Sequence, residues 1–326
     1  MVMTRLVAID IGGTHVRFAL ARIDADNAIV LDEPATLHCH DFPSLEAAWK
    51  EFEARVGTAL PPAVAIAVAA TVNADEIHLT NNRWIIRQSE LNASLGVGRV
   101  TVVNDFAAIA HAVARLDDSH FQYLAGPDQP LGTEGTISIL GPGTGLGVAH
   151  LWRGVGGVYR VQATEGGHID FAPLDPTEDA ILAHLRAKHA RVSVERVVSG
   201  PAIVDIYETL AKLEGGSPAE LDDVAIWSKG MAGEDKLAMA AIDRFCLSLG
   251  SVAGDIALAQ GGFAGVVVAG GMGYRLREVL QVSGFAERFC AKGRFEPLLA
   301  SIPVRIIGHP QPGLFGAAAA FAFEHS

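Results

Sequence analysis

Residues 6–14 have the sequence LVAIDIGGT, which predicts a buried strand followed by a tight turn. The apolar run at 6–9 is typical of a strand that is covered on both faces. Gly12 and Gly13 let backbone N–H groups approach an anion closely, and Thr14 adds a hydroxyl donor. Because Asp10 would repel a bare phosphate, we expect a cation, most simply Mg²⁺, between the two. The segment therefore predicts a phosphate-binding hairpin of a nucleotide-dependent enzyme.

A second segment of the same design lies at 137–151, with the sequence ISILGPGTGLGVAHL. Its Gly143-Thr144 matches Gly13-Thr14, whereas Leu140 stands in the place of Asp10. Either loop alone could be an ordinary turn, since Gly-Gly and Pro-Gly are common turn formers. The pair indicates two related domains that face one ligand, with only the first domain meeting the metal.

Composition favours a cytoplasmic enzyme and opposes several other classes. The chain has 326 residues, half of them hydrophobic, and a net charge of −12, which opposes binding to nucleic acid or an anionic membrane. No apolar run reaches the roughly 20 residues that span a bilayer, and there is no signal peptide. The three cysteines are too scattered for a disulfide framework. In residues 38–40 (HCH) the donors would alternate sides along a strand, which argues against a metal site there.

The remaining sequence alternates between strand and helix patterns, as α/β proteins do. No Walker P-loop, Rossmann turn or protein-kinase triplet occurs. Asp175 is a predicted N-cap, with Pro176 at the first helical position and Glu178 completing a capping box. Strands are expected at 63–69, 77–79, 100–103, 266–269 and 304–307, and helices at 107–116, 176–189, 201–214, 234–260 and 313–323.

Six segments, in the order in which the family has them, resemble the bacterial glucokinase family. They are DIGGTHVR (10–17), NDF (104–106), LGPGTGLGVAH (140–150), EGGHIDFAP (165–173), ERVVSGP (195–201) and AGGMG (269–273). The resemblance implies an α/β fold of two RNase H-like domains of the actin-like ATPase superfamily, with a cleft between them. It implies a small domain of residues 1–112 plus 309–326 and a large domain of 113–308. It favours this branch over the ROK kinases, which typically carry a Cys-rich zinc segment that this sequence lacks.

An Asn-Asp pair follows the strand expected at 100–103, where an apolar sheet has no other need for an acid. Asp105 could be the N-cap of the following helix or a catalytic base. The resemblance implies that Asp105 is the base, and Asn104 can both donate to and accept from sugar hydroxyls.

The resemblance also assigns sugar and nucleotide contacts. From the residues alone, Glu165 to His168 could be a solvated turn, and Gly270-Gly271 a plain strand–helix turn. By resemblance Glu165, His168 and Glu195 hold the sugar with Asn104 and Asp105, whereas Asp170 is structural. Residues 80–84 resemble a sugar-proximal segment without an assigned role, and residues 69–72 lack the proline that relatives usually have. The implied nucleotide contacts are Asp10 (also Mg²⁺, through water), Ile11, Gly12, Gly13, Thr14, His15, Gly143, Thr144, Gly145, Gly270 and Gly271.

These observations predict a kinase that uses ATP and Mg²⁺ to phosphorylate glucose at its 6-hydroxyl. Arg17 could steady a phosphate, but pairing with an acid is the expected role. Two alternatives remain open, namely a kinase of another hexose or N-acetylhexosamine, and a non-catalytic regulator of the same fold. A homodimer is implied by the resemblance alone.

Overall fold

The computed structural model describes residues 3–79 and 82–325, so Thr80 and Asn81 of the segment at 80–84 lie outside the described residues. The chain divides into two compact units. The first comprises Met1–Asp117, Val161–Ala163 and His309–Ser326, and the second comprises Asp118–Arg160 and Thr164–Gly308. The boundary expected at residue 112 falls inside a helix that ends at Arg115. The division into functional domains stays a prediction.

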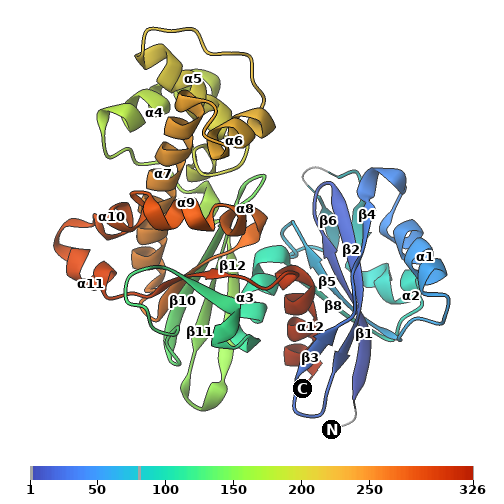
Figure 1. Ribbon diagram of the computed structural model, residues 1–326. Helices are drawn as coiled ribbons and strands as arrows, with labels where there is room; N and C mark the ends of the chain where they lie inside the picture. Colours follow the sequence, from blue (N-terminus) through green and yellow to red (C-terminus); the bar gives the residue numbers. More distant parts are fainter. Residues whose placement is uncertain (1–2, 80–81, 326) are drawn as a thin grey trace. The chain divides into compact units, whose positions relative to one another are not determined.

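The first unit contains a sheet with the strand order β3-β2-β1-β5-β8, and β4 also pairs with β2 (Figure 1). β1 is antiparallel to β2 and parallel to β5, which is parallel to β8. β6 and β7 form a separate hairpin. The strands are β1 Thr4–Ile11, β2 His15–Ile23, β3 Ile29–Leu31, β4 Ala35–His38, β5 Ala63–Val68, β6 Glu76–His78, β7 Ile85–Arg87 and β8 Arg99–Asn104.

The two faces of this sheet carry side chains of different size. Along β5, alanines alternate with valine and isoleucine, so the small side chains all lie on one face. The alanine face packs against α12, and the larger face packs against Trp49 and Phe52 of α1. Small residues let α12 and α3 pack closely, since a Cβ at Gly316 would lie 1.8 Å from the Ala108 carbonyl oxygen. The helices are α1 Leu45–Val56, α2 Leu91–Leu95, α3 Asp105–Arg115 and α12 Pro312–His325.

The second unit repeats the topology of the first. Its sheet order is β12-β11-β10-β13-β14-β9, in which β10 is antiparallel to β11 and parallel to β13, and β13 is parallel to β14. The two glycine hairpins, β1–β2 and β10–β11, therefore occupy equivalent places in the two sheets. The strands of this sheet are β9 Phe121–Ala125, β10 Gly135–Pro142, β11 Leu146–Arg153, β12 Tyr159–Thr164, β13 Gly265–Val268 and β14 Val304–Ile307, although Val161–Ala163 of β12 are grouped with the first unit.

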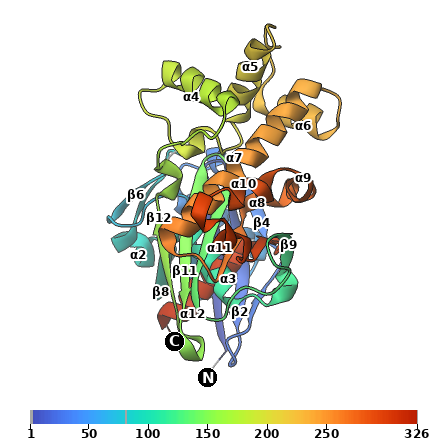
Figure 2. The same cartoon turned by 90° about the vertical axis from the view of Figure 1, so that its left-hand side faces the viewer.

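A long helix, α7, forms the centre of the second unit's core, with α5, α6 and α10 packed along it (Figures 1 and 2). Among the described residues α7 alone is long and apolar enough to cross a membrane, but 67% of its most apolar window is buried inside the structure. Its apolarity is therefore that of a core helix. The helices are α4 Pro176–Lys188, α5 Ile203–Leu213, α6 Asp223–Met231, α7 Lys236–Gln260, α8 Gly270–Arg275, α9 Arg277–Val282, α10 Phe285–Cys290 and α11 Glu296–Ala300.

At the start of α4 the predicted N-cap, Asp175, is confirmed, but the predicted capping box with Glu178 is wrong. Asp175 accepts a hydrogen bond from the Glu178 N–H at 3.0 Å, as predicted. Glu178 does not close the reciprocal capping box, because its carboxylate accepts from the Leu174 N–H at 2.7 Å, one residue before the cap. This carboxylate is 1% exposed and also pairs with Arg288 of α10 at 3.3 Å. Tertiary ion pairing has therefore moved the side chain away from its local partner.

Candidate active site

Asp10 lies at the carboxyl end of β1, directly across the β1–β2 hairpin from Arg17. The Arg17 guanidinium is 3.3 Å from the Asp10 carboxylate, so the expected pairing with an acid is present. Burial raises the pKa of Asp10 because it disfavours the charged carboxylate, and the nearby Arg17 only partly opposes this. The first turn of α12 also abuts the acid, since a Cβ at Gly313 would lie 2.8 Å from Asp10 Oδ2. The acid thus carries negative charge at an energetic cost that a bound cation would offset.

The first glycine loop is held from behind by the segment after β4. The Cys39 N–H donates to the Thr14 carbonyl at 2.9 Å, and the Cys39 thiol contacts the Gly12 carbonyl at 3.7 Å. Within the loop, the Gly12 N–H donates to the His15 carbonyl at 2.9 Å. Thr14 is exposed at the tip. The backbone of the loop is therefore fixed by hydrogen bonds, and the Thr14 hydroxyl is accessible. Both properties suit a loop that binds phosphate.

Asn104 and Asp105 lie where β8 ends and α3 begins. Asn104, and not Asp105, is the N-cap, because its side-chain oxygen accepts from the N–H groups of Phe106 and Ala107 at 2.9 and 3.1 Å. The Asn104 amide also donates to the Ala70 carbonyl at 3.2 Å, which ties the loop at 69–72 to this helix start. Asp105 is the first helical residue and is half-buried. The Asp105 carboxylate also accepts from the Phe106 N–H at 2.9 Å, so it shares that donor with Asn104, whereas the Ala107 N–H bonds to Asn104.

The second glycine loop and the predicted sugar residues meet within the second unit. Glu195 Oε2 lies 2.7 Å from the position that a Cβ would take on Gly145. Its other oxygen is 3.5 Å from Nδ1 of His168. The His168 N–H donates to the Glu165 carbonyl at 2.9 Å. The structure therefore places one carboxylate between a phosphate-loop glycine and a candidate sugar ligand.

A second contact supports the sugar segment from outside. The Arg191 guanidinium donates to the His168 carbonyl and pairs with Asp170, both at 2.6 Å. Asp170 is 76% exposed, so it contributes little stability by this pair. A structural role for Asp170 stays a prediction.

Gly270 and Gly271 begin α8 directly after β13. Gly270 has a φ of 83°, and a Cβ there would lie 3.2 Å from the Pro142 carbonyl of the second glycine loop. Beyond its chain neighbours and its own helix backbone, no described atom lies within 4 Å of a Cβ built on Gly271. The pair therefore forms an open backbone surface beside the phosphate loop.

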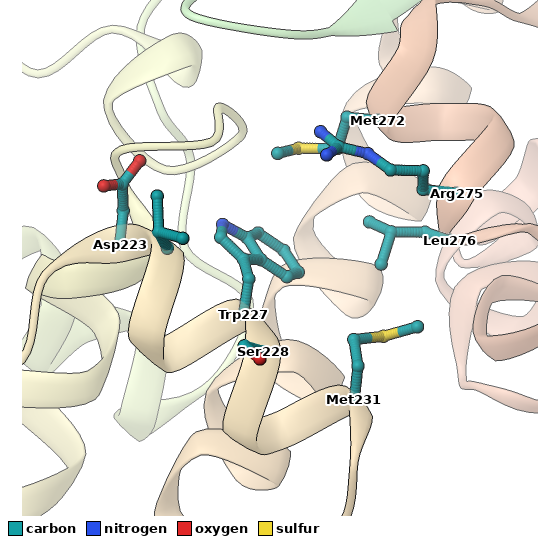
Figure 3. Close-up of a pocket in the computed structure, with 8 residues that line it drawn as sticks. Asp223, Trp227, Ser228, Met231, Met272, Arg275 and Leu276 are labelled. Atoms are coloured by element: carbon teal, nitrogen blue, oxygen red, sulfur yellow. The ribbon is translucent and has the colours of Figure 1, made fainter.

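A pocket of about 500 Å³ lies between α6 and α8, and sequence reasoning did not find it. Figure 3 shows Trp227 projecting from α6 toward Met272 and Leu276. The sequence does carry a signal for this pocket. Trp227 and Met231 are four residues apart, as are Met272 and Leu276, and this spacing puts each pair on one face of a helix. Its lining is mostly apolar and consists of Asp223, Val224, Trp227, Ser228, Met231, Met272, Arg275 and Leu276.

The predicted site residues fall in both units. Asp10 to His15, Asn104 and Asp105 belong to the first, and Gly143 to Gly145, Glu165, His168, Glu195, Gly270 and Gly271 belong to the second. Asp10 and Asn104 lie at the ends of the parallel strands β1 and β8, and Gly143 and Gly270 follow the parallel strands β10 and β13, at the carboxyl ends where open α/β sheets bind ligands.

Two units with the same strand arrangement, each with a glycine hairpin, define the actin-like ATPase fold of the sugar kinases. The chain belongs to the glucokinase family, whose model, described as Glucokinase, matches residues 6–324. It is 51% identical to the glucokinase of Zymomonas mobilis, over 98% of each chain. It is similar to the crystal structure of glucokinase from an Antarctic psychrotroph, with a TM-score of 0.85, 34% identity and coverage of 98% and 99% of the two chains. A ROK family glucokinase from Streptomyces griseus, in complex with glucose and AMPPNP, shares the fold, with a TM-score of 0.63, 20% identity and coverage of 96% and 98%.

Proposed function

We propose that this protein transfers the γ-phosphoryl group of ATP to the 6-hydroxyl of glucose. The observation that carries the proposal is the contact of Glu195 with both Gly145 and His168, which joins a phosphate-binding loop to a sugar-binding segment. Membership of the glucokinase family supports the same reaction. A non-catalytic regulator would have no need of this juxtaposition.

The phosphates of ATP bind at the two glycine loops, Gly12 to Thr14 and Gly143 to Gly145. Asp10 would hold Mg²⁺ through water, and the fit is supported by its carboxylate, which is 21% exposed although it pairs with Arg17. One carboxylate suits Mg²⁺, which keeps several of its waters. When bound, the ion neutralises charge on the phosphates.

Glucose is held by residues of both units. The Glu195 carboxylate accepts hydrogen bonds from sugar hydroxyls, and the His168 ring can accept or donate. Glu165 supplies a further carboxylate. From the first unit, Asn104 has one amide N–H to offer, because its side-chain oxygen caps α3 and its other N–H donates to the Ala70 carbonyl.

Asp105 accepts the proton of the 6-hydroxyl as that oxygen attacks the γ-phosphorus in line. General-base assistance of this kind contributes roughly 10²- to 10⁴-fold to a rate. The remaining acceleration comes from positioning and from charge stabilisation by the backbone N–H groups of the loops. Closure of the two units on the substrates would exclude water as a competing acceptor.

The adenosine group binds at Gly270 and Gly271, and its base enters the pocket between α6 and α8. The volume of about 500 Å³ and the apolar lining of Trp227, Met272 and Leu276 suit a flat heterocycle. The assignment is supported by Gly200, at which a Cβ would lie 2.9 Å from the pocket-lining Met272 and 3.1 Å from the Gly143 carbonyl oxygen of the second loop.

A coupled assay of ADP production tests the proposal across glucose, mannose, fructose, N-acetylglucosamine and no sugar. We expect turnover with glucose to exceed that with each other sugar, and no turnover without sugar. ATP hydrolysis that is independent of sugar would support an ATPase of another kind. A higher kcat/KM with an N-acetylhexosamine would identify the alternative substrate class.

The protein is expected to act in the cytoplasm and to form a homodimer. The location is supported by the family and by a net charge of −12, and the homodimer rests on the family resemblance alone. Light scattering on the protein as it leaves a size-exclusion column tests the dimer, since a measured mass of 34.3 kDa, that of the monomer, would contradict it.

A further inference from the structure

We infer that Trp227 is a positioning residue, which connects the pocket between α6 and α8 to the second phosphate-binding loop through Gly200. This inference rests on the proposed function, because it takes residues 143–145 as the loop that holds ATP phosphates. It goes further by giving a role in phosphoryl transfer to a residue that contacts no phosphate.

The Trp227 ring is held by two contacts in addition to the pocket wall. Its indole N–H donates to the Gly200 carbonyl at 2.9 Å. Its ring meets the edge of the fully buried Phe245 of α7 at a centroid distance of 5.1 Å and an angle of 88°. Since the N–H group is engaged by the protein, the ring offers the pocket an apolar surface in a fixed orientation.

Gly200 contacts the phosphate loop on its other side. Its N–H donates to the Gly143 carbonyl at 2.7 Å. A Cβ at Gly200 would lie 2.9 Å from the terminal carbon of Met272 and 3.1 Å from the Gly143 carbonyl oxygen. Glycine is therefore the residue that lets this backbone touch a pocket-lining methionine and the loop at the same time.

The second phosphate-binding loop, Gly143 to Gly145, is fixed by contacts at Gly145 and is open beside Gly143. The Gly143 N–H donates to the Gly145 carbonyl at 2.8 Å, and Gly145 abuts the Glu195 carboxylate. By contrast, no atom lies within 4 Å of a Cβ built on Gly143. The hydrogen bond from Gly200 therefore sets the position of the Gly143 carbonyl, and with it the direction of the open face that receives the phosphates.

Two successive hydrogen bonds thus run from the pocket wall to the phosphate loop, from Trp227 to Gly200 and from Gly200 to Gly143. A base packed against Trp227 binds to the ring whose N–H group orients Gly200. Loss of that N–H group should therefore misplace the loop without removing the apolar wall. A misplaced loop lowers the rate of transfer more than it weakens binding.

The test is Trp227→Phe, which keeps an aromatic wall and removes the N–H donor. We expect kcat to fall about 5-fold or more, as for the loss of one hydrogen bond, with KM for ATP changed less than 2-fold. Trp152→Phe is the matched control, because Trp152 lies in the same unit, is 45% exposed and belongs to no proposed site. Hydrogen exchange should be faster in peptides that contain Gly143 and Gly200 in Trp227→Phe alone.

Gly200→Ala tests the same connection from its other end and keeps Trp227 in place. The added methyl group forces the Gly143 carbonyl to move, so we expect the same fall in kcat. Gly98→Ala is its control, since a Cβ there makes only an ordinary contact of 3.6 Å with the Pro62 carbonyl. A kcat equal to that of the unsubstituted protein in either variant would overturn the inference, as would a rise in KM for ATP with kcat unchanged. Absence of glucose phosphorylation by the unsubstituted protein would instead refute the proposed function.

Discussion

Glu195 Oε2 occupies the space beside Gly145 in which a side chain would begin, 2.7 Å from the ideal Cβ position. A residue of the proposed phosphate-binding loop and a candidate sugar ligand are thus in direct contact. We therefore expect recognition of the two substrates to be coupled in this unit, although sequence motifs assign the two residues to different ligands.

Gly145→Ala should weaken glucose binding, although Gly145 belongs to the phosphate loop. The methyl group displaces the Glu195 carboxylate, and losing a hydrogen bond to a charged group costs about 1.5–3 kcal/mol, or roughly 10- to 100-fold in affinity. Calorimetric titration with glucose measures this. Gly143→Ala is the control, because its Cβ meets no atom within 4 Å. Equal glucose affinities for the two variants would contradict the proposed contact.

Asp105→Asn should lower kcat by about 10²-fold or more, because it removes the proposed base. The helix should remain capped, since Asn104 supplies the cap of α3. Glucose binding should survive in weakened form through Glu165, His168 and Glu195. The variant is measured by turnover and by glucose calorimetry, and near-normal turnover would remove Asp105 from the mechanism.

Asp10→Asn should impair the use of Mg·ATP and leave glucose binding without nucleotide little changed, and Thr14→Val should do the same.

The pKa of Asp10 is raised in the folded state, so ionisation of this carboxyl destabilises the folded protein. The stability that its protonated form provides is lost as the pH rises from about 3.8 through the folded pKa. The ligand-free Asn variant should therefore unfold at a higher temperature than the unsubstituted protein at neutral pH. A lower melting temperature would show that the Arg17 pair outweighs the burial of Asp10, and loss of glucose binding in a folded variant would refute the assignment of this loop.

His111 should make the protein less stable in mild acid. Burial against α12 lowers the pKa of His111 from 6.5 to about 4. Since the unfolded chain takes up the proton first, the free energy of unfolding should fall by roughly 1 kcal/mol between pH 7.5 and pH 5.5. Urea denaturation of His111→Gln should lack this part of the pH dependence, and His78→Gln, which replaces an exposed side chain, should keep it. Identical pH profiles for all three proteins would refute the assignment.

Glucose should compact the protein, because the residues proposed to hold it belong to both units. A ligand shifts a conformational equilibrium only by its difference in affinity for the two states. Small-angle scattering should give a smaller radius of gyration with glucose than without it. Mannose, altered only at carbon 2, should give less compaction and a lower kcat. An unchanged profile with glucose, or a mannose result equal to that of glucose in both measurements, would refute the coupling.

The sequence alone determined the features that depend on local pattern. Apolar runs and helical spacing predicted β5, β8 and α7 to within about two residues, since burial on a sheet or helix has a fixed period. The paired glycine loops predicted the repeated topology. The order of six family motifs implied the family, which the matching family model confirms. The roles of Asp105, Glu165, His168 and Glu195 remain predictions.

Tertiary structure alone decided which of these segments touch. Gly145 and Glu195 are 50 positions apart. Gly143 lies in the turn between β10 and β11, Gly200 in the segment before α5, and Trp227 on α6. Their contacts follow from sheet register and from the packing of α6 and α8, which no local propensity encodes. The same cause moved Glu178 from its capping box to Arg288, whereas the cap of α3 by Asn104 is a local contact. Local pattern specifies which elements form, whereas the competition among distant partners for each polar group is settled only when the chain has folded.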